Sequence, residues 1–306
     1  MRNRLQRRYA RYWQLYVFLL IPVVYILIFS YYPMLGLQIA FKKFNFKGGI
    51  WGSPWVGLYQ FRKFLNAYQF KLVLKNTLVL SAYSILAAFP FPILFALTLN
   101  VIQAKKFKKF AQTVTYIPHF ISVVVLVGML MQIFHPLTGV YGALARALTG
   151  STPADLLASP STFPHMYVWS GVWQGFGYNS IIYLAALSGV SAELHEAAEI
   201  DGASRLQRVI HIDFPAILPT VTIMLIMRMG SVMSLGFQKI YLMQNTLNLS
   251  TSEVISTFVY KKGLASGAGN DYSYSTAIGM FNSVINLLLL ACVNGVSRKL
   301  SENSLW

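Results

Sequence analysis

Apolar residues along this chain fall into blocks of about 20 positions, separated by stretches that hold most of the charges. A helix of about 20 apolar residues crosses the roughly 30 Å of hydrocarbon in a bilayer. Backbone groups in lipid must bond within their own segment, so each block is expected to be helical. The pattern predicts an all-α polytopic membrane protein, a single domain over residues 1–306, with six transmembrane helices near residues 14–36, 76–101, 112–134, 166–190, 212–235 and 274–297.

Composition and charge placement support a membrane protein and predict its orientation. Charged residues make up 11% of the chain, against about a quarter in soluble domains. The net charge of +16 does not indicate nucleic-acid binding, because thirteen cations gather in short segments on one side of the predicted spans. The positive-inside rule then places both termini in the cytoplasm. These cations are Arg2, Arg4, Arg7, Arg8, Arg11, Lys105, Lys106, Lys108, Lys109, Arg205, Arg208, Arg298 and Lys299.

The first apolar block argues against a cleaved signal peptide, and the cysteine content excludes an intrachain disulfide. The block is long and no small-residue cleavage site follows it, which favours an uncleaved span over a signal peptide. The single cysteine, Cys292, excludes an intrachain disulfide.

Three longer segments, at about 37–72, 135–165 and 236–273, are expected on the outer side. They carry turn residues and aromatic side chains such as Trp51 and Trp55. Two interpretations stay open at this point. The aromatic residues could anchor the chain at the membrane interface, or they could form a docking surface for an external partner.

An acidic segment between the fourth and fifth predicted spans is the most distinctive feature of the chain. Five of the nine acids lie in or beside it: Glu193, Glu196, Glu199, Asp201 and Asp213. Ser191 is suited to cap a helix that ends at Gly202, because glycine tolerates the left-handed backbone that closes helices. Asp201 or Ser204 is suited to cap a second helix. Pro215 fits the first turn of the next span, and Pro219 follows one turn later.

The same segment presents a compact face. Ala197 and Ala198 have short side chains, and Glu196 and Glu199, three positions apart, project from nearly one side. Such a face is suited to a groove lined by basic residues. A solvated acidic loop would explain the charges, but not the Ala-Ala pair, the glycine and the two prolines.

At these positions the chain resembles a known family, the permease subunits of bacterial ATP-binding-cassette (ABC) importers, in their EAA loop. Val209 and Phe214 differ from the usual residues, apolar for apolar. The resemblance implies that residues 191–211 form a cytoplasmic coupling helix and turn that dock on an ATPase subunit. The implied ATPase-coupling residues are Glu196, Ala197, Ala198, Glu199, Asp201, Gly202, Ala203, Pro215 and Pro219.

The N-terminal part resembles the carbohydrate branch of that family, in particular its polysaccharide and alginate-type members. The residues that carry this likeness are Pro33, Gly36, Ala40, Phe41, Lys42, Gly48, Trp51, Trp55, Val56, Gly57 and Phe61. The likeness covers essentially the whole chain and implies the type I ABC importer permease fold in a bacterial cytoplasmic membrane. It also implies four partner subunits: a second homologous permease, two ATPases and an extracytoplasmic solute-binding protein.

The resemblance implies a non-catalytic subunit that binds no cofactor of its own. ATP and Mg²⁺ would be bound by the partner ATPases, since the sequence contains no GxxxxGK[ST] phosphate-binding loop. The predicted spans also contain no Asp or Glu at depth, which argues against a carrier driven by protons or sodium through its own carboxylates.

Candidate contacts for a transported sugar lie in the fourth, fifth and sixth blocks. Aromatic rings stack on sugars and amides bond to their hydroxyls, although helix packing explains the same residue types. Arg228 is the lone deep cation, which either reaches the outer interface or meets an anionic, alginate-like substrate. The candidate substrate-path residues are Trp169, Trp173, Gln174, Tyr178, Asn179, Arg228, Asn282 and Asn286.

The leading function is therefore the membrane subunit of an ATP-driven importer for an oligosaccharide or polysaccharide fragment. Import of another solute, such as a peptide or polyol, is the alternative within the same class. A membrane enzyme would need a catalytic cluster, for which His135, His165 and Asp155 are the candidates, and their spacing matches no template for metal or acid–base chemistry. His119 is expected to pack between helices.

Overall fold

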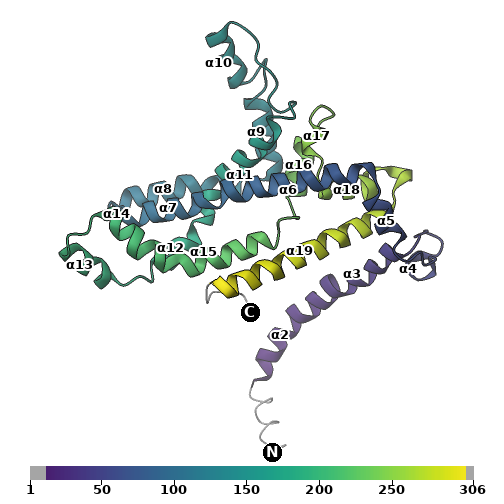
Figure 1. Ribbon diagram of the computed structural model, residues 1–306, viewed down its shortest axis with the longest axis horizontal. Coiled ribbons are helices and arrows are strands. Elements are labelled where there is room, and N and C mark those ends of the chain that lie inside the picture. Colours follow the sequence, from purple (N-terminus) through teal and green to yellow (C-terminus); the bar gives the residue numbers. More distant parts are fainter. Residues whose placement is uncertain (1–11, 301–306) are drawn as a thin grey trace, which may run out of the picture. The chain divides into compact units, whose positions relative to one another are not determined.

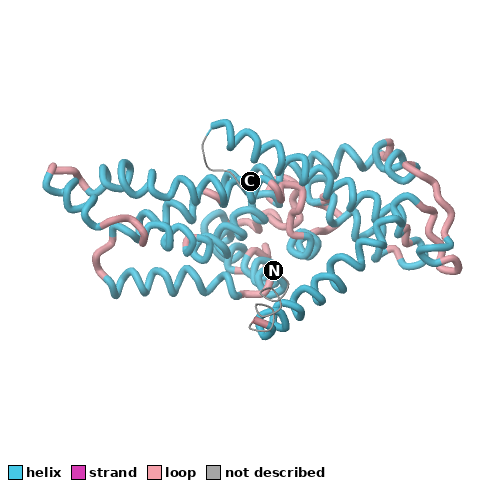
Figure 2. The backbone as a smooth tube through the Cα atoms, turned by 90° about the horizontal axis from the view of Figure 1, so that it is seen from below, coloured by secondary structure: helices cyan, strands magenta, loops and turns pink. Residues whose placement is uncertain are grey.

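The computed structural model describes residues 12–300, and this range is mostly helical (Figure 1, Figure 2). Within it, the β-type pairing is limited to an isolated bridge between Lys42 and Trp55. The all-α fold class is therefore confirmed. The N-terminal arginines used to predict orientation, Arg2 to Arg11, lie outside the described residues.

The described helices form two compact units. The first contains residues up to Asn66 together with Lys262–Met280, and the second contains Ala67–Lys261 together with residues from Phe281 onward. The helices are α2 (Trp13–Ile26), α3 (Tyr32–Met34), α4 (Gly49–Gly52), α5 (Tyr59–Leu65), α6 (Tyr68–Ala88), α7 (Pro90–Val101), α8 (Lys105–Tyr116), α9 (Val123–Ile133), α10 (Val140–Thr149), α11 (Phe163–Asn179), α12 (Ile181–Leu187), α13 (Ala192–Ile200), α14 (Arg205–Arg208), α15 (Phe214–Met229), α16 (Phe237–Met243), α17 (Leu249–Ser252), α18 (Ile255–Tyr260) and α19 (Tyr272–Leu300).

Within residues 12–300, four helical stretches are long and apolar enough to cross a bilayer. They are Trp13–Phe41, Tyr68–Val101, Arg205–Met229 and Tyr272–Lys299, and they coincide with the first, second, fifth and sixth predicted blocks. The third block is bent by 99° between Lys105–Phe120 and Val123–Ile133, and counts as a fifth span if the pair is taken together. A count of six spans remains a prediction.

Each predicted span was expected to be one continuous helix, and three of them differ from this expectation. The bend in 112–134 follows Pro118, and the Ser122 hydroxyl restarts the helix by accepting a hydrogen bond from the N–H of Val125. The 166–190 span divides at Ser180 into α11 and α12. The 212–235 span ends early, because α15 stops at Met229 and the next helix starts at Phe237.

The second unit is a bundle in which α11 lies along α6, α7 and α8, and α12 packs between α7 and α15 (Figure 1). One apolar core joins Ala96 of α7, Tyr183 of α12 and Ile217 of α15. Gly177 permits the close approach of α11 to α8, because a Cβ there would lie 2.3 Å from the carbonyl oxygen of Thr115. The bundle thus holds α15, which follows the acidic segment, against α7 and α12.

The first unit brings residues 270–274 against α5 and the segment before it. Lys63 forms a 2.8 Å ion pair with Asp271, and the N–H of Phe44 donates to the Ser273 hydroxyl at 2.9 Å. Trp51 and Trp55 are 74% and 66% exposed. This exposure fits both interpretations of the outer aromatic residues, membrane anchoring and partner docking.

Candidate coupling loop and transport cavity

The acidic segment folds as a helix, a glycine turn and a second helix. The Ser191 hydroxyl caps α13 by accepting from the N–H of Glu193 at 3.2 Å. Gly202 has a φ of +80°, a left-handed conformation that costs a residue with a Cβ about 1–2 kcal/mol. Around it, the N–H of Ala203 donates to the Ala198 carbonyl at 2.8 Å and that of Gly202 to Glu199 at 3.1 Å. This pair of bonds is the Schellman closure of a helix.

The chain then continues without a break into α15. Ser204, and not Asp201, caps α14 in a reciprocal pair of bonds with Gln207. A turn of π-helix over Val209–Asp213 joins α14 to α15. Pro215 lies in the first turn of α15, as predicted, and Pro219 lies inside the helix. A displacement of α13 is therefore transmitted through a single ordered connection to the bundle.

Two contacts hold α13 against its surroundings. On the surface, Arg208 pairs with Glu199 at 3.0 Å, and the Glu199 side chain is 70% exposed. The second contact is deeper, because Asp213 is 2% exposed. Its Oδ1 accepts from Nδ2 of Asn100 at 3.1 Å and lies 3.2 Å from Nε2 of His195. This buried brace of His195, Asp213 and Asn100 ties α13 to the ends of α7 and α15.

The sequence analysis did not identify His195 or Asn100 as functional. The available signal was indirect: a histidine beside Glu196, and two polar residues, Asn100 and Asp213, at the margins of apolar blocks 113 residues apart. Nothing in the local pattern says that these three side chains meet.

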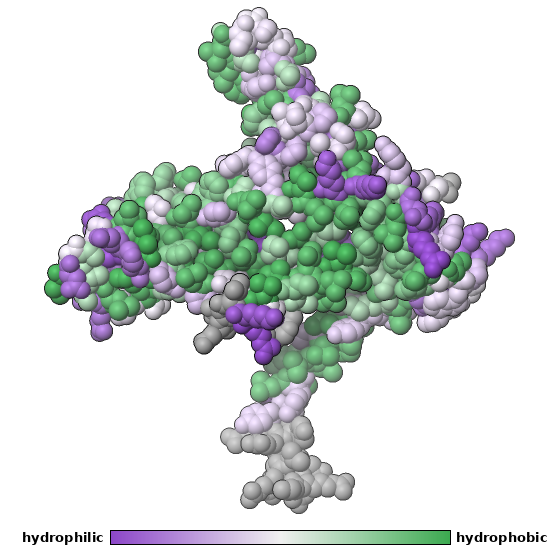
Figure 3. Space-filling view, in the orientation of Figure 1, coloured by the Kyte–Doolittle hydropathy of each residue, from purple (hydrophilic) through white to green (hydrophobic). Residues whose placement is uncertain are grey.

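The solvent-exposed surface of the loop carries apolar side chains. Leu194, Ile200 and Leu206 are 55%, 87% and 68% exposed, and Ala197 lies between the first two on α13. We call these four residues the coupling face. It lies at the end of the bundle that carries α13 and α14, where hydrophilic residues gather around it (Figure 3). An apolar patch rimmed by charges is typical of a protein interaction site.

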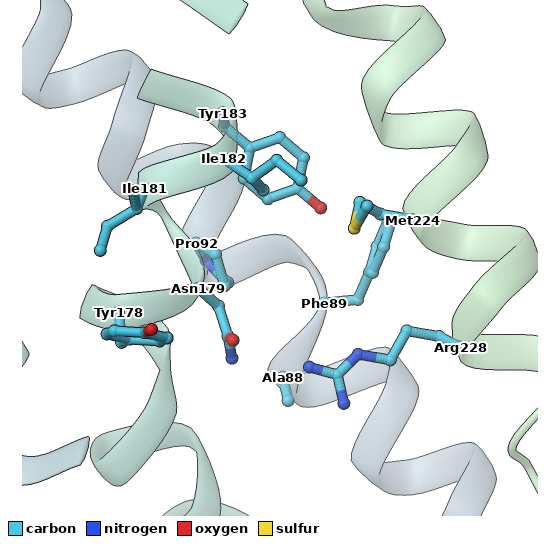
Figure 4. A pocket seen from close by; sticks show the side chains of 10 residues that line it. All are labelled: Ala88, Phe89, Pro92, Tyr178, Asn179, Ile181, Ile182, Tyr183, Met224 and Arg228. Carbon is cyan, nitrogen blue, oxygen red and sulfur yellow. The ribbon is translucent and has the colours of Figure 1, made fainter. Parts of the chain in front are cut away.

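Three of the predicted substrate-path residues line one cavity. It measures about 450 Å³ and is formed by α15, the junction of α6 with α7, and the junction of α11 with α12. Tyr178, Asn179 and Arg228 all face it (Figure 4). Its remaining lining residues are Ala88, Phe89, Pro92, Ile181, Ile182, Tyr183 and Met224.

The other aromatic candidates lie elsewhere. Trp169 and Trp173 line a separate apolar groove of about 410 Å³ against α9, and Trp169 packs edge-on to Phe91. Gln174 uses its amide to donate to the Ile121 carbonyl at 2.9 Å, within the bend of the third span. Tyr178 stacks flat on His119 with ring centroids 3.8 Å apart, which agrees with a packing role for that histidine.

The two asparagines of the sixth block have different surroundings. Asn286 packs against the unwound chain after α15, where its Oδ1 accepts from the N–H of Met233 and its Nδ2 donates to Ser234. Among the described residues the buried Oδ1 of Asn282 has no hydrogen-bond partner. Packing thus accounts for Asn286, whereas Asn282 keeps an unsatisfied acceptor.

Lys239, one of the cations expected on the outer side, is buried. Its amine donates to the Tyr167 carbonyl at 3.0 Å and lies 5.0 Å from the centre of the Tyr167 ring. Burial lowers the pKa of this amine to about 8. The residue is a structural contact between α11 and α16.

The three side chains considered for an enzyme each have local partners. His135 accepts at Nδ1 from the N–H groups of Leu137 and Thr138, and Asp155 accepts from Leu157 and Ala158. His165 bonds to the Tyr83 hydroxyl at 2.8 Å. Each contact is of a kind that shapes a turn or joins two helices.

Comparisons with known proteins find one family and relatives that match nearly the whole chain. The profile of the family described as "Binding-protein-dependent transport system inner membrane component" matches residues 88–302. Protein LplB of Bacillus subtilis (strain 168) is 40% identical over 292 residues, covering 95% of this chain and 91% of that protein. The polygalacturonan/rhamnogalacturonan transport system permease protein YteP of the same organism is 39% identical, covering 100% of this chain and 94% of its own.

Solved structures show the same fold. A chain in the crystal structure of a bacterial ABC transporter involved in the import of the acidic polysaccharide alginate superposes with a TM-score of 0.88 at 37% identity. The superposition covers 97% of this chain and 99% of the other. A second alginate transporter structure, in complex with an alginate pentasaccharide-bound periplasmic protein, also gives a TM-score of 0.88, at 36% identity and 99% coverage of this chain.

Proposed function

This chain belongs to the family of binding-protein-dependent transport system inner membrane components, and from this premise we propose that it imports an oligosaccharide or polysaccharide fragment. It is a multi-pass, non-catalytic permease subunit of an ABC importer in the inner membrane. Two relatives that cover nearly all of the chain carry a sugar polymer in their names or titles. Their likeness supports a carbohydrate as the cargo of this chain.

The observation that carries the proposed drive by a separate ATPase is the coupling face on α13 and α14. It presents apolar side chains to solvent within a charged loop, and the loop is joined rigidly to α15 and α7. A face of this kind suits a groove on a cytoplasmic ATPase, with Glu196 and Asp201 meeting basic residues at its rim. ATP and Mg²⁺ would be bound by that ATPase.

The proposed transport cycle is a rigid-body switch between two packed states. ATP binding closes a pair of ATPase subunits, and α13 follows its docking groove. The buried brace passes this movement to α7 and α15, so that the bundle turns against a second, homologous permease. An extracytoplasmic solute-binding protein delivers the sugar at the outer side, and both termini lie in the cytoplasm.

The experiment is a purification of this chain with its neighbouring gene products, followed by ATPase measurement in proteoliposomes. The panel contains neutral oligosaccharides, uronate oligosaccharides, peptides and polyols, each with the solute-binding protein. We expect oligosaccharides to raise the ATPase rate several-fold, about 1 kcal/mol in the rate-limiting barrier. Stimulation by peptides or polyols alone would contradict a carbohydrate cargo, and purification without any ATPase subunit would contradict the coupling role.

A further inference from the structure

A second cavity, of about 380 Å³, lies between the loop of α13 and α14 and the end of the bundle. The loop lines it with His195 on α13 and with Arg205 and Arg208 on α14. The bundle lines it with Gln103, which follows α7, and with Ser188, which follows α12. The cavity is therefore at the margin of the predicted spans, on the side predicted to be cytoplasmic.

The lining has more hydrogen-bond donors than acceptors. Within residues 12–300, the Arg205 guanidinium and the Gln103 amide make no hydrogen bond or ion pair with another residue. Arg208 uses one N–H, which donates to Glu199 at 3.0 Å, and a guanidinium has about five such donors. Several N–H groups therefore remain free to bind a ligand.

The acid in the lining does not neutralise these arginines. Asp213 is 2% exposed, and its Oδ1 already accepts from Asn100 and lies 3.2 Å from Nε2 of His195. The chain after Gln103 adds the exposed lysines Lys105 and Lys106. The cavity thus carries an excess of positive charge beside a basic segment, which favours an anion.

The helix that contains the two arginines does not explain them. α14 continues through the π-helical turn Val209–Asp213 into α15, so Arg205–Met229 is one helical stretch. Both arginines lie near its start, where the positive end of the helix dipole disfavours cations. Glu199 compensates Arg208, whereas Arg205 has no anion among the described residues.

The chemistry of the lining fits a phosphate group. Arg205 and Arg208 are three positions apart and share a face of the helix. A planar guanidinium binds two phosphate oxygens through parallel hydrogen bonds. The volume lies within the range of small-molecule sites, about 300–1,000 Å³, and leaves room for a substituent on the phosphate. Basic pockets between membrane helices on the cytoplasmic side are known to bind anionic lipid headgroups.

We propose that this cavity binds a phosphate group, with Arg205 and Arg208 pairing with its oxygens from the loop and Gln103 donating from the bundle. The phosphate is carried either by an anionic lipid headgroup of the adjacent leaflet or by free phosphate in solution. The two sources share one chemistry, and the experiment separates them. The inference goes beyond the proposed function, because it requires nothing of the transported solute.

The test measures two kinds of binding to the complete transporter, with a non-hydrolysable ATP analogue filling the ATPase sites. In the first arm, radiolabelled inorganic phosphate is titrated into the transporter in phosphatidylcholine nanodiscs. In the second arm, the transporter is purified from vesicles of phosphatidylglycerol and phosphatidylcholine, and the retained phosphatidylglycerol is counted by mass spectrometry. Both arms compare the wild type with Arg205→Gln, Arg205→Lys and Arg298→Gln.

We expect Arg205→Gln to weaken binding about tenfold in one of the two arms, the loss of one charge-assisted pair. A loss in the first arm identifies free phosphate, and a loss in the second identifies a lipid headgroup. Arg205→Lys should give intermediate binding, because lysine keeps the charge but not the planar fork. Arg205 is exposed and makes no contact of its own, so these variants should fold.

Arg298→Gln is the matched control, because it removes an exposed cation on the same predicted side and outside the cavity lining. Equal binding by the wild type and Arg205→Gln in both arms, or an equal loss in Arg298→Gln, would overturn the site. Loss of the ATPase subunit from Arg205→Gln, with both kinds of binding unchanged, would assign Arg205 to the ATPase interface and also overturn it. These failures would leave the proposed function intact, since its test is stimulation of ATP hydrolysis by sugar.

Discussion

Replacing Gly202 by valine is expected to lower sugar-stimulated ATP hydrolysis in the assembled transporter about tenfold or more. Gly202 has a φ of +80°, and no atom lies within 4 Å of the position that a Cβ would take. The penalty for valine is therefore conformational, about 1–2 kcal/mol or more for a β-branched residue. At about 1.4 kcal/mol per tenfold, this strain is enough to depopulate the turn that orients α13.

The control for this prediction is a second glycine with the same backbone conformation. Gly150 has a φ of +70°, also with no atom within 4 Å of its Cβ position, and it ends α10 in a segment predicted to lie outside. Gly150→Val carries a similar strain and should retain coupling. Gly202→Asn should recover much of the activity, because asparagine tolerates the left-handed region. Full coupled transport by Gly202→Val, with membrane insertion intact in both variants, would sink this prediction.

Substituting Asp213 by alanine should be the second most damaging single change. The carboxylate is buried and holds both His195 and Asn100, so its removal leaves two polar side chains without their acceptor. Losing hydrogen bonds to a charged group costs about 1.5–3 kcal/mol, and unpaired buried groups add to this. Hydrogen exchange at α13 should rise about tenfold or more as the loop detaches, and sugar-stimulated ATPase activity should fall with it.

Glu199→Gln is the matched control for the brace. It breaks the ion pair with Arg208, but the Glu199 side chain is 70% exposed, and such surface pairs contribute about 0–1 kcal/mol. Hydrogen exchange and coupling should therefore change little. Asp213→Asn should have effects on hydrogen exchange and coupling between those of Glu199→Gln and Asp213→Ala, because an amide keeps one acceptor oxygen. Equal effects of Glu199→Gln and Asp213→Ala would show that the loop is held by surface charge instead of by the buried brace.

The structure of the coupling loop was predictable because its signals are local. Ser191 at a helix start, Gly202 at a helix end and Pro215 in a first turn each act within a few residues of the chain. The choice between Asp201 and Ser204 as the second cap depended on geometry, and the bond from the N–H of Gln207 to the Ser204 hydroxyl decides it.

The features missed from the sequence depend on contacts between distant residues. The early end of α15 is stabilised by Ser81 and Asn286, which lie more than 50 residues from the unwound segment. Apolar periodicity records only that residues 230–235 avoid water, so it predicted a continuous helix there. The hydrogen bond between Asn100 and Asp213 could not be predicted either, because the two residues are 113 positions apart in the sequence.

The substrate-path candidates in α11 show a related limit. Trp169 and Trp173 are four residues apart and share a face, whereas Tyr178 follows Trp169 by nine residues, about two and a half turns. The two groups must point to opposite sides of the helix, and they line different cavities. Arg228 joins Tyr178 and Asn179 because α15 packs on α12, a contact that no spacing within either segment specifies.

The most direct test of the central claim, that this chain is driven by a separate ATPase through α13, is site-specific crosslinking. Cys292, the only cysteine, is first replaced by alanine, and Ala197→Cys is introduced at the coupling face. A photoreactive maleimide at this position is predicted to crosslink to the ATPase subunit. The same reagent at Ser151→Cys, which is exposed in a segment predicted to lie outside, should not do so. Transport that continues while position 197 gives no ATPase crosslink, or equal crosslinking from position 151, would contradict the account.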